Sequence, residues 1–208
     1  MSPVLQSSRD RILERIRKAN THAIAHELSM PRAYDRASTR SADNTLALFK
    51  ERLRDYDAGV FLVHKHEIAQ KAAELLADRR IVIPQALPSE WLHEAIEWIP
   101  DHDLSFDALN NVDGVMTAAT VGVAVSGSIA LQHGSGEGRR ILTLLPDYHL
   151  CVIGTAQVVE TLPEAFARLD RARPVTFFSG PSATADIEMT RIKGVHGPRF
   201  LDVLLVQD

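Results

Sequence analysis

Residues 149–154 read HLCVIG, and residues 200–206 read FLDVLLV. Apolar side chains fill almost every position of both runs, whereas a strand with one face in water alternates apolar and polar residues. Both runs therefore predict strands whose two faces are covered by other parts of the protein. Amphipathic helical patterns over 43–57, 66–78 and 157–171 supply covering elements. Because helical connections of this kind join parallel strands, we predict a three-layer α/β fold with a mainly parallel sheet.

The other elements that the pattern predicts are shorter. We expect a hairpin in which residues 114–118 and 123–131 pair as strands around Ser126-Gly127, because glycine supplies the positive φ that such a turn needs. Asp43 is expected to cap the helix that follows it. The remaining elements, with Ser89 capping the first of the two helices, are strands 58–64, 80–84 and 174–180 and helices 88–98 and 184–192.

Residues 1–42 predict an N-terminal helical arm ahead of the α/β domain, which we place at 43–208. A helical pattern runs over 8–28 with Ser8 as its cap, and its polar face is heavily charged. A proline and several small polar residues interrupt the periodicity over 29–42, which predicts an exposed linker. Such an arm either packs against a neighbouring subunit or is mobile.

The overall composition argues against several classes of function. The 208 residues carry a net charge of −4 without a dense basic run, so nucleic-acid binding has no electrostatic support. The one cysteine, Cys151, predicts a buried, inert thiol, and it can supply neither an internal disulfide nor the four thiolates of an iron–sulfur cluster. The N-terminus lacks the apolar stretch of a secretory signal, and no window approaches the roughly 20 apolar residues of a membrane span. We therefore expect a cytoplasmic protein.

The stretch SGPSATADIE, residues 179–188, predicts a strand-to-helix turn at the functional site. Gly180 ends an apolar strand, and Ser182 and Thr184 stand where the expected helix begins. Ligands of open α/β sheets bind beyond the carboxyl ends of strands, where free helix N–H groups and nearby hydroxyls hold a phosphate or carboxylate. The alternative is that these residues merely cap the helix.

Three side chains near this turn are candidates for acid–base catalysis: Asp186, Glu188 and His196. The two carboxylates fall in the first turns of the expected helix. The alternative is that they only stabilise the helix through a favourable interaction with its dipole. His196 lies in GVHGPR, residues 194–199, and imidazole exchanges protons near neutral pH. The alternative is a turn whose imidazole bonds to the backbone. Since this loop directly follows the expected helix, we expect both segments to face one pocket.

The loop HGSGEGRR, residues 133–140, is a third candidate site. Its backbone N–H groups and the guanidiniums of Arg139 and Arg140 can cradle an anionic group, and the alternative is a flexible surface loop. It lacks the Lys-Ser/Thr ending of a nucleotide-binding P-loop. No metal site is expected, because no HExxH or paired-Cys motif occurs and the pair His22 and His26 has no third ligand nearby in the sequence.

Taken in order, three stretches resemble the lactate utilization protein C family, whose members share the LUD domain. They are GVMTAATVGVAVSGSIAL (114–131), GRRILTLLPDYHLCVIG (138–154) and PVTFFSGPSATADIEMTRIKGVHGPRFLDVLLV (174–206). The last stretch is the most specific, because GPSATADIE followed by GVHGP is long and contiguous. The similarity is strong over the C-terminal half and follows the order of helices and strands elsewhere.

The resemblance implies a fold related to the sugar-isomerase and CoA-transferase-like class, and a role in the oxidation of L-lactate to pyruvate. It also implies two partner subunits that carry iron–sulfur clusters, so that this chain binds no cofactor itself. Members of the family commonly read AETGT in the hairpin, where this chain reads AVSGS over 124–128. Gly127 is retained and joins the ligand-binding candidates, whereas Val125 stands in place of the usual glutamate and cannot act as a general base.

The leading hypothesis is a subunit or accessory protein of L-lactate utilization that binds an anionic ligand over 179–199. The alternative is a stand-alone enzyme of the acyl-transfer, phosphoryl-transfer or isomerase type on the related fold, with Asp186, Glu188 and His196 as its acid–base groups. A third hypothesis is a small-molecule sensor or scaffold whose charged arm contacts a partner. The ligand-binding candidates are Gly127, Arg139, Arg140, Gly180, Ser182 and Thr184.

Overall fold

The computed structural model describes residues 7–21, 33, 34, 36–185, 191–194 and 196–207. The chain divides into one unit of residues 1–34 and another of residues 35–208. In the first unit, helix α1 (Ser8–Thr21) follows Ser7, whose hydroxyl accepts a hydrogen bond from the Asp10 main-chain N–H at 3.2 Å. The helix cap is thus one residue earlier than expected, and the expected continuation to residue 28 lies outside the described residues.

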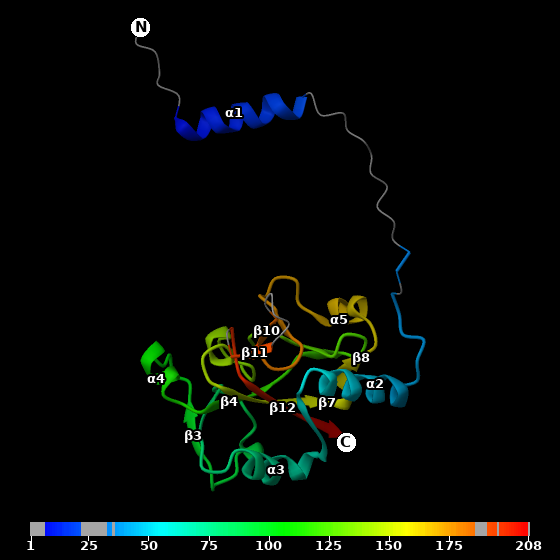
Figure 1. The fold of residues 1–208 in the computed structure, drawn as a ribbon, viewed down its shortest axis with the longest axis vertical. Helices are drawn as coiled ribbons and strands as arrows, with labels where there is room; N and C mark the ends of the chain where they lie inside the picture. The colour runs from blue at the N-terminus through cyan, green and yellow to red at the C-terminus, as the bar shows by residue number, and fades with distance from the viewer. Residues whose placement is uncertain (1–6, 22–32, 35, 186–190, 195, 208) are drawn as a thin grey trace. The chain divides into compact units, whose positions relative to one another are not determined.

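Six parallel strands form the central sheet of the second unit. They are β1 (Gly59–His64), β2 (Arg80–Ile83), β3 (Glu97–Pro100), β4 (Gly114–Ala118), β7 (Tyr148–Gly154) and β12 (Phe200–Gln207). Their order across the sheet is β1-β12-β7-β4-β2-β3, and every neighbouring pair is parallel. The two runs that indicated the fold, in β7 and β12, are neighbours inside this sheet (Figure 1), so the predicted mainly parallel sheet is confirmed.

Both faces of the central sheet are covered, which explains why its inner strands are apolar without alternation. One face packs against α3 (Ile68–Leu75), and Leu150 of β7 belongs to the core on that side. The other face packs against α2 (Ala42–Asp55) and a second sheet, and the next residue, Cys151, shares a core there with Phe49. Figure 1 shows α3 and α2 on opposite sides of the strands. The three-layer α/β arrangement is therefore confirmed.

The start of helix α2 connects to the segment before it. Ser41 caps the helix, since its hydroxyl accepts a first-turn main-chain N–H at 3.3 Å, while Asp43 lies in the first turn instead of at the cap. Ser38 and Arg40 bind the carboxylate of Glu160, with a hydroxyl contact of 2.7 Å and a guanidinium contact of 3.0 Å. The end of the expected linker is thus hydrogen-bonded to the body of the protein.

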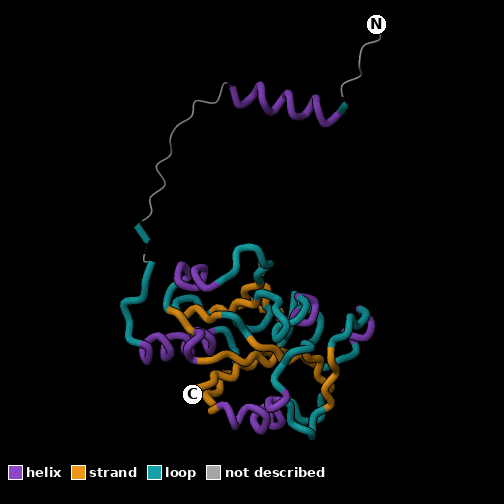
Figure 2. Tube along the Cα trace, turned by 180° about the vertical axis from the view of Figure 1, so that it is seen from behind, coloured by secondary structure: helices purple, strands orange, loops and turns teal. Residues whose placement is uncertain are grey.

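A second sheet of four short strands lies on the α2 side of the central sheet. Its strands, in spatial order, are β8 (Val158–Val159), β5 (Val121–Val123), β6 (Ser128–Leu131) and β9 (Thr176–Phe178). The expected hairpin turn at Ser126-Gly127 joins β5 to β6, but the run 114–118 does not pair with them and forms β4 of the central sheet. The strand expected over 174–180 is present as β9, antiparallel to β6. Helix α5 (Leu162–Arg168) packs against this sheet, as Figure 2 shows from behind.

Two expected helices are wrong. The segment expected to be a helix over 184–192 instead supplies β10 (Ala183–Ala185) and β11 (Arg191–Lys193), an antiparallel pair in which Thr184 stands opposite Ile192. Both of these residues are β-branched, which favours strand over helix.

Within 88–98 only a short 3₁₀ turn, η2 (Ser89–Trp91), precedes β3. Ser89 does not cap it with its side chain. Pairing of Glu97 with Arg80 on β2 draws the end of this segment into the sheet, and such tertiary pairing overrides helical propensity.

The remaining elements are one helical turn and three short 3₁₀ turns: α4 (Phe106–Asn110), η1 (Lys65–Glu67), η3 (Arg140–Thr143) and η4 (Thr155–Gln157). The sequence pattern did not indicate α4, although Ser105 caps it by accepting the Ala108 N–H at 3.2 Å. Across the part of the chain that the structure describes, no helix combines the length and the apolar character needed to cross a bilayer.

Candidate functional site

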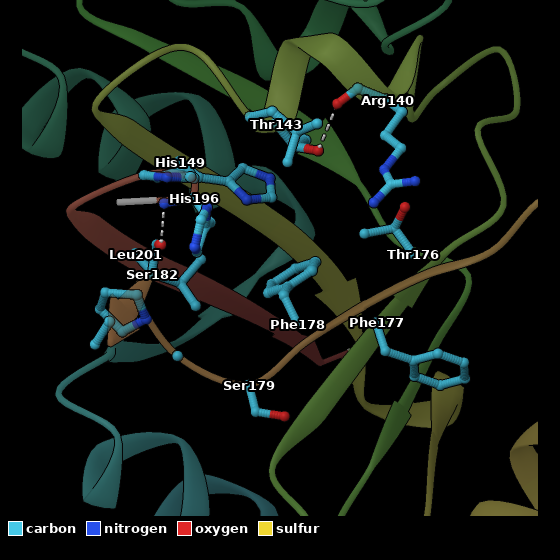
Figure 3. Close-up of a pocket in the computed structure, with 16 residues that line it drawn as sticks. Arg140, Thr143, His149, Thr176, Phe177, Phe178, Ser179, Ser182, His196 and Leu201 are labelled. Carbon is cyan, nitrogen blue, oxygen red and sulfur yellow. Dashed lines mark hydrogen bonds between the residues drawn. The ribbon is translucent and has the colours of Figure 1, made fainter. Parts of the chain in front are cut away.

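A cavity of about 330 Å³ lies between the central and second sheets. Its walls come from the amino ends of β7 and β12, from η3, from the end of β9 and from the loop 196–198 (Figure 3). We expected a ligand beyond the carboxyl end of the strand over 174–180, and the cavity does adjoin that end of β9. For the central parallel sheet, however, the cavity lies at the opposite edge from the usual one.

Four of the predicted site residues line this cavity: Arg140, Gly180, Ser182 and His196. The Ser182 hydroxyl accepts the His196 main-chain N–H at 3.0 Å (Figure 3). The Ser182 main-chain N–H donates to the Pro198 carbonyl at 2.8 Å. The segments SGPSATADIE and GVHGPR thus line one cavity. Because strand β10 directly follows Ser182, loop hydroxyls and main-chain groups stand where the strand-to-helix turn was expected, and that turn is a wrong prediction.

Three of the other predicted residues fall in or beyond β10. Thr184 is the middle residue of that strand, and its side chain is not described. Asp186 and Glu188 lie outside the described residues. His196 is therefore the acid–base candidate that the structure places, with an exposed side chain at the cavity.

Arg139 has a partner elsewhere. Its guanidinium binds Asp101 in a two-pronged contact, with Nε–Oδ2 and Nη2–Oδ1 distances of 2.8 and 2.6 Å, and it also donates to the Leu104 carbonyl at 3.1 Å. This contact holds the pKa of Asp101 below its ordinary value. The geometry gives Arg139 a structural role, in contrast to the ligand-binding role that its position beside Arg140 suggested.

Two predicted glycines have conformational reasons to be glycine. Gly127 has a φ of +58°, and a Cβ there would lie 2.7 Å from the Arg52 Cβ. Gly180 has a φ of +79°, and its Cβ would lie 2.4 Å from the Tyr56 Cβ and 2.8 Å from the Tyr56 carbonyl oxygen. Both turns therefore pack against the end of α2, which only a residue without a side chain permits.

The glycine-rich loop 133–138 folds around its own glutamate. The buried Glu137 carboxylate accepts the hydroxyl of Thr120 and the main-chain N–H groups of Gln132 and Gly134. Two of the groups expected to cradle an external anion, the Gly134 N–H and the Arg139 guanidinium, are therefore bonded inside the protein. These bonds anchor residues 133–138, in contrast to the flexible surface loop considered as the alternative, and Arg140 is the residue of the predicted 133–140 site that lines the cavity.

His149 is a cavity residue that the sequence did not single out. It is 2% exposed, its Nε2 lies 2.8 Å from Thr117 Oγ1, and its ring centroid lies 5.2 Å from that of Phe178. Burial lowers the pKa of His149 to about 3, so the imidazole is neutral at physiological pH. The available signal was the imidazole itself at the head of an otherwise apolar strand, because polar side chains are uncommon in such a place.

Arg140 gives the cavity its charge. Figure 3 shows its guanidinium directed toward Thr176, and it forms no hydrogen bond or ion pair with any residue that the structure describes. Among the described residues that line the cavity, none carries a carboxylate. A guanidinium without a counter-charge, next to hydroxyl groups, favours an anionic ligand.

The hairpin reaches the same region through its serines. Ser128 Oγ lies 2.8 Å from Ser126 Oγ and 2.6 Å from Ser179 Oγ, and Ser179 lines the cavity. Val125, which lies where the family resemblance led us to expect a glutamate, is 46% exposed and brings no acid–base group. Hydroxyl groups are therefore the polar groups that the hairpin contributes.

At the carboxyl edge of the central sheet, where parallel sheets usually bind ligands, local contacts hold the strand ends beside a second cavity of about 450 Å³, which Gly154, Gln157 and Val206 help to line. Gln157 accepts the Gly154 N–H at 2.7 Å and donates to the Ala119 carbonyl at 2.6 Å, and Glu67 accepts the His64 N–H at 2.7 Å. These bonds occupy the main-chain N–H groups of Gly154 and His64, which are therefore not available to an anion. Within the described part of the chain, no group of three or more His, Cys, Asp or Glu side chains is placed to hold a metal.

Comparison with known proteins shows a consistent family. A family model of the LUD domain matches residues 46–206. "Lactate utilization protein C" of Deinococcus radiodurans is 38% identical over 164 residues, which cover 76% of this chain and 77% of that protein. The protein of the same name from Shouchella clausii is 30% identical over 115 residues, so the match spans 50% of that relative and 52% of this chain. The crystal structure of a DUF162 family protein from Deinococcus radiodurans has a TM-score of 0.71 and 34% identity, covering 81% of this chain and 99% of that one.

The matched range contains the second sheet, nearly all of the central sheet and every described residue that lines the cavity. Sequence and backbone therefore agree over the part of the molecule in which the cavity is built. On both grounds this chain belongs to the LUD domain family.

Proposed function

We propose that this protein acts in lactate utilization as a subunit that binds a small carboxylate, while partner subunits with iron–sulfur clusters transfer the electrons. The relatives named lactate utilization protein C support the pathway. The binding role is supported by the chemistry of the cavity beside η3. Its volume of about 330 Å³ is near the lower end of the roughly 300–1,000 Å³ that small-molecule sites occupy.

The carrying observation is the guanidinium of Arg140. It lines the cavity without a counter-charge among the described residues, and Arg139 next to it is already bound to Asp101. Arginine binds carboxylates through two parallel hydrogen bonds, which are stronger than bonds between neutral groups. A carboxylate in the cavity would supply a counter-charge for this guanidinium, which has none among the described residues.

The other polar groups orient a ligand without competing for its charge. His149 is neutral, so its imidazole can make a hydrogen bond to a ligand but adds no second positive charge. Ser179 and Ser182 add hydroxyls, and Phe178 and Leu201 supply apolar contact. A carboxylate with a short carbon chain matches this mixture of one cation, neutral polar groups and apolar surface.

Electron transfer is assigned to partners because this chain has one thiol. Oxidation of a 2-hydroxy acid to a 2-oxo acid releases two electrons and two protons, so an acceptor must be present. Cys151 is buried, and burial raises the pKa of its thiol, which keeps it protonated and inert. A cluster that needs four thiolates therefore belongs to another subunit.

The binding role is tested by calorimetric titration of L-lactate into the wild-type protein and into Arg140→Gln. We expect Arg140→Gln to weaken binding by about tenfold or more, because a charged hydrogen-bonded contact is lost. Arg171→Gln, at an exposed arginine outside this cavity, is the matched control and should bind like the wild type. Equal affinity of Arg140→Gln and the wild type would contradict the proposal. The partner role is tested by measuring iron and sulfide in complexes isolated with the full chain from cells grown on L-lactate.

A further inference from the structure

The hydroxyl groups of the cavity differ in the bonds that they already make. Thr143 Oγ1 donates to the Arg140 main-chain carbonyl at 3.1 Å, so its proton is directed to that carbonyl. Ser182 Oγ instead accepts the His196 N–H at 3.0 Å, so its own proton remains for a ligand. A hydroxyl has one proton and two lone pairs, so such partners decide whether it meets a ligand as donor or as acceptor.

His133 determines whether the Thr176 hydroxyl meets a ligand as a donor or as an acceptor. His133 has a φ of +55°, its Nδ1 lies 3.1 Å from the Gly138 carbonyl oxygen, and its Nε2 lies 2.8 Å from Thr176 Oγ1. Because a carbonyl only accepts, Nδ1 carries the proton, and the neutral ring then has a lone pair at Nε2. Thr176 therefore donates to Nε2 and has only lone pairs left for the cavity.

The two hydroxyl groups that act as acceptors, those of Thr143 and Thr176, lie near the Arg140 guanidinium. Figure 3 shows the Arg140 guanidinium directed toward Thr176, with Thr143 on the same side and Ser182 across the cavity. A ligand carboxylate held by Arg140 thus brings the atoms next to it close to hydroxyl oxygens that can accept but not donate.

We infer that the cavity selects a carboxylate whose neighbouring carbon carries a hydrogen-bond donor, a 2-hydroxy acid, over the matching 2-oxo acid. The inference rests on the proposed function, because Arg140 must hold the carboxylate. A 2-hydroxyl group donates its proton to Thr176 or Thr143. A keto oxygen has no proton to donate, so its lone pairs face the lone pairs of the threonine oxygens and no hydrogen bond forms. A 2-ammonio acid has protons to donate, but its positive charge lies beside the guanidinium and is repelled.

Three acids with one carbon skeleton test the selectivity: L-lactate, pyruvate and L-alanine. Each is titrated calorimetrically into the full-length protein at alkaline pH, which favours neutral imidazole. We expect L-lactate to bind about tenfold more tightly than pyruvate, because one hydrogen bond is gained with L-lactate and one acceptor is left unpaired with pyruvate. We expect L-alanine to bind weakest. Pyruvate binding as tightly as L-lactate overturns the inference.

Variants at the acceptors separate selectivity from folding. Thr176→Val keeps the shape and the β-branch that suit β9, and the double variant with Thr143→Val removes both acceptors. We expect the lactate preference to fall to about twofold in the double variant, mainly through weaker lactate binding, and to persist in Thr176→Ser. A tenfold preference that survives in the double variant overturns the inference.

The outcomes also distinguish this inference from the proposed function. If neither L-lactate nor pyruvate binds the wild type, or if binding is indifferent to Arg140→Gln, the carboxylate site is wrong and the selectivity with it. If both acids bind with a dependence on Arg140 but without a preference for L-lactate, only the selectivity is wrong.

Discussion

Ser182 holds His196 from fourteen residues away, because its hydroxyl accepts the His196 main-chain N–H at 3.0 Å. Its main-chain N–H donates to the Pro198 carbonyl at 2.8 Å, and its carbonyl accepts the Gly194 N–H at 2.9 Å. Ser182 thus bonds to Gly194, His196 and Pro198, and the last two of these line the cavity. The side chain supplies the central bond, and the two main-chain bonds do not depend on it.

Replacing Ser182 with alanine should loosen the centre of this loop while leaving the fold intact. We expect the His196 amide to exchange its hydrogen faster and L-lactate to bind a few-fold more weakly. Global stability should fall by no more than about 1 kcal/mol, because both main-chain bonds remain. Hydrogen exchange, calorimetry and urea unfolding measure the three effects. Ser135→Ala, at an exposed serine outside the cavity, is the control. Unchanged exchange at His196 would show that the hydroxyl bond does not hold the loop.

The central sheet could be predicted because its strands carry their own signal. In β7 consecutive residues such as Leu150 and Cys151 belong to cores on opposite faces, so the sequence is apolar throughout. The sequence indicated β9 and the run that contains β6, but it carries little signal for the pairing of the second sheet, since β8 has two residues and β5 and β9 have three each. Strands this short show no measurable periodicity, and only their tertiary neighbours decide how they pair.

The candidate site could be predicted in part, through residues whose type suits turns. Ser182 and His196 were found because small and polar residues cluster around them. Arg139 and Arg140 are indistinguishable in sequence, and only the position of Asp101 decides which of them is bonded inside the protein. His149 was missed because its neutral state results from burial in β7, and burial depends on the packed fold.

Arg139→Gln should destabilise the protein, whereas Arg140→Gln should not. Removing the guanidinium leaves the Asp101 carboxylate, 5% exposed, without its charged partner. We expect a loss of about 2 kcal/mol, less than for a fully buried pair because the Arg139 side chain is 39% exposed. Arg140→Gln, the same substitution at the next residue, should change stability by less than about 0.5 kcal/mol. Urea unfolding of both variants measures the contrast, and equal effects would contradict these assignments.

The Arg139 effect should also depend on pH. Arg139 lowers the pKa of Asp101 in the folded protein, so the pair stabilises the fold above the unfolded-state pKa of about 3.9. That stabilisation is lost as the pH falls through the lower folded-state pKa. The stability difference between the wild type and Arg139→Gln should thus be complete at pH 7 and shrink below about pH 4. A difference that stays constant down to acid unfolding would rule out a charge-dependent contact.

Gly180→Ala should be costly, although alanine is the smallest possible addition. The new Cβ would lie 2.4 Å from the Tyr56 Cβ, and the φ of +79° is itself unfavourable for alanine. We expect a loss of about 2 kcal/mol or more, together with weaker L-lactate binding, since Gly180 lines the cavity. Gly136→Ala is the matched control, because its nearest neighbour would lie at 3.5 Å and its φ is not positive. Thermal unfolding compares the two, and similar melting temperatures would argue against a tight contact at Tyr56.

His149 should make the protein lose stability as the pH falls from about 6.5 towards 3. Burial lowers its folded-state pKa to about 3, whereas an unfolded histidine titrates near 6.5, so in this window only the unfolded state binds the proton. The free energy of unfolding then falls by about 1.4 kcal/mol per pH unit from this residue alone. His149→Gln removes that contribution, so its curve should be shallower and approach that of the wild type as the pH drops. Urea unfolding between pH 7.5 and about pH 5 measures both slopes. The same slope in both proteins would show that His149 takes up its proton without unfolding.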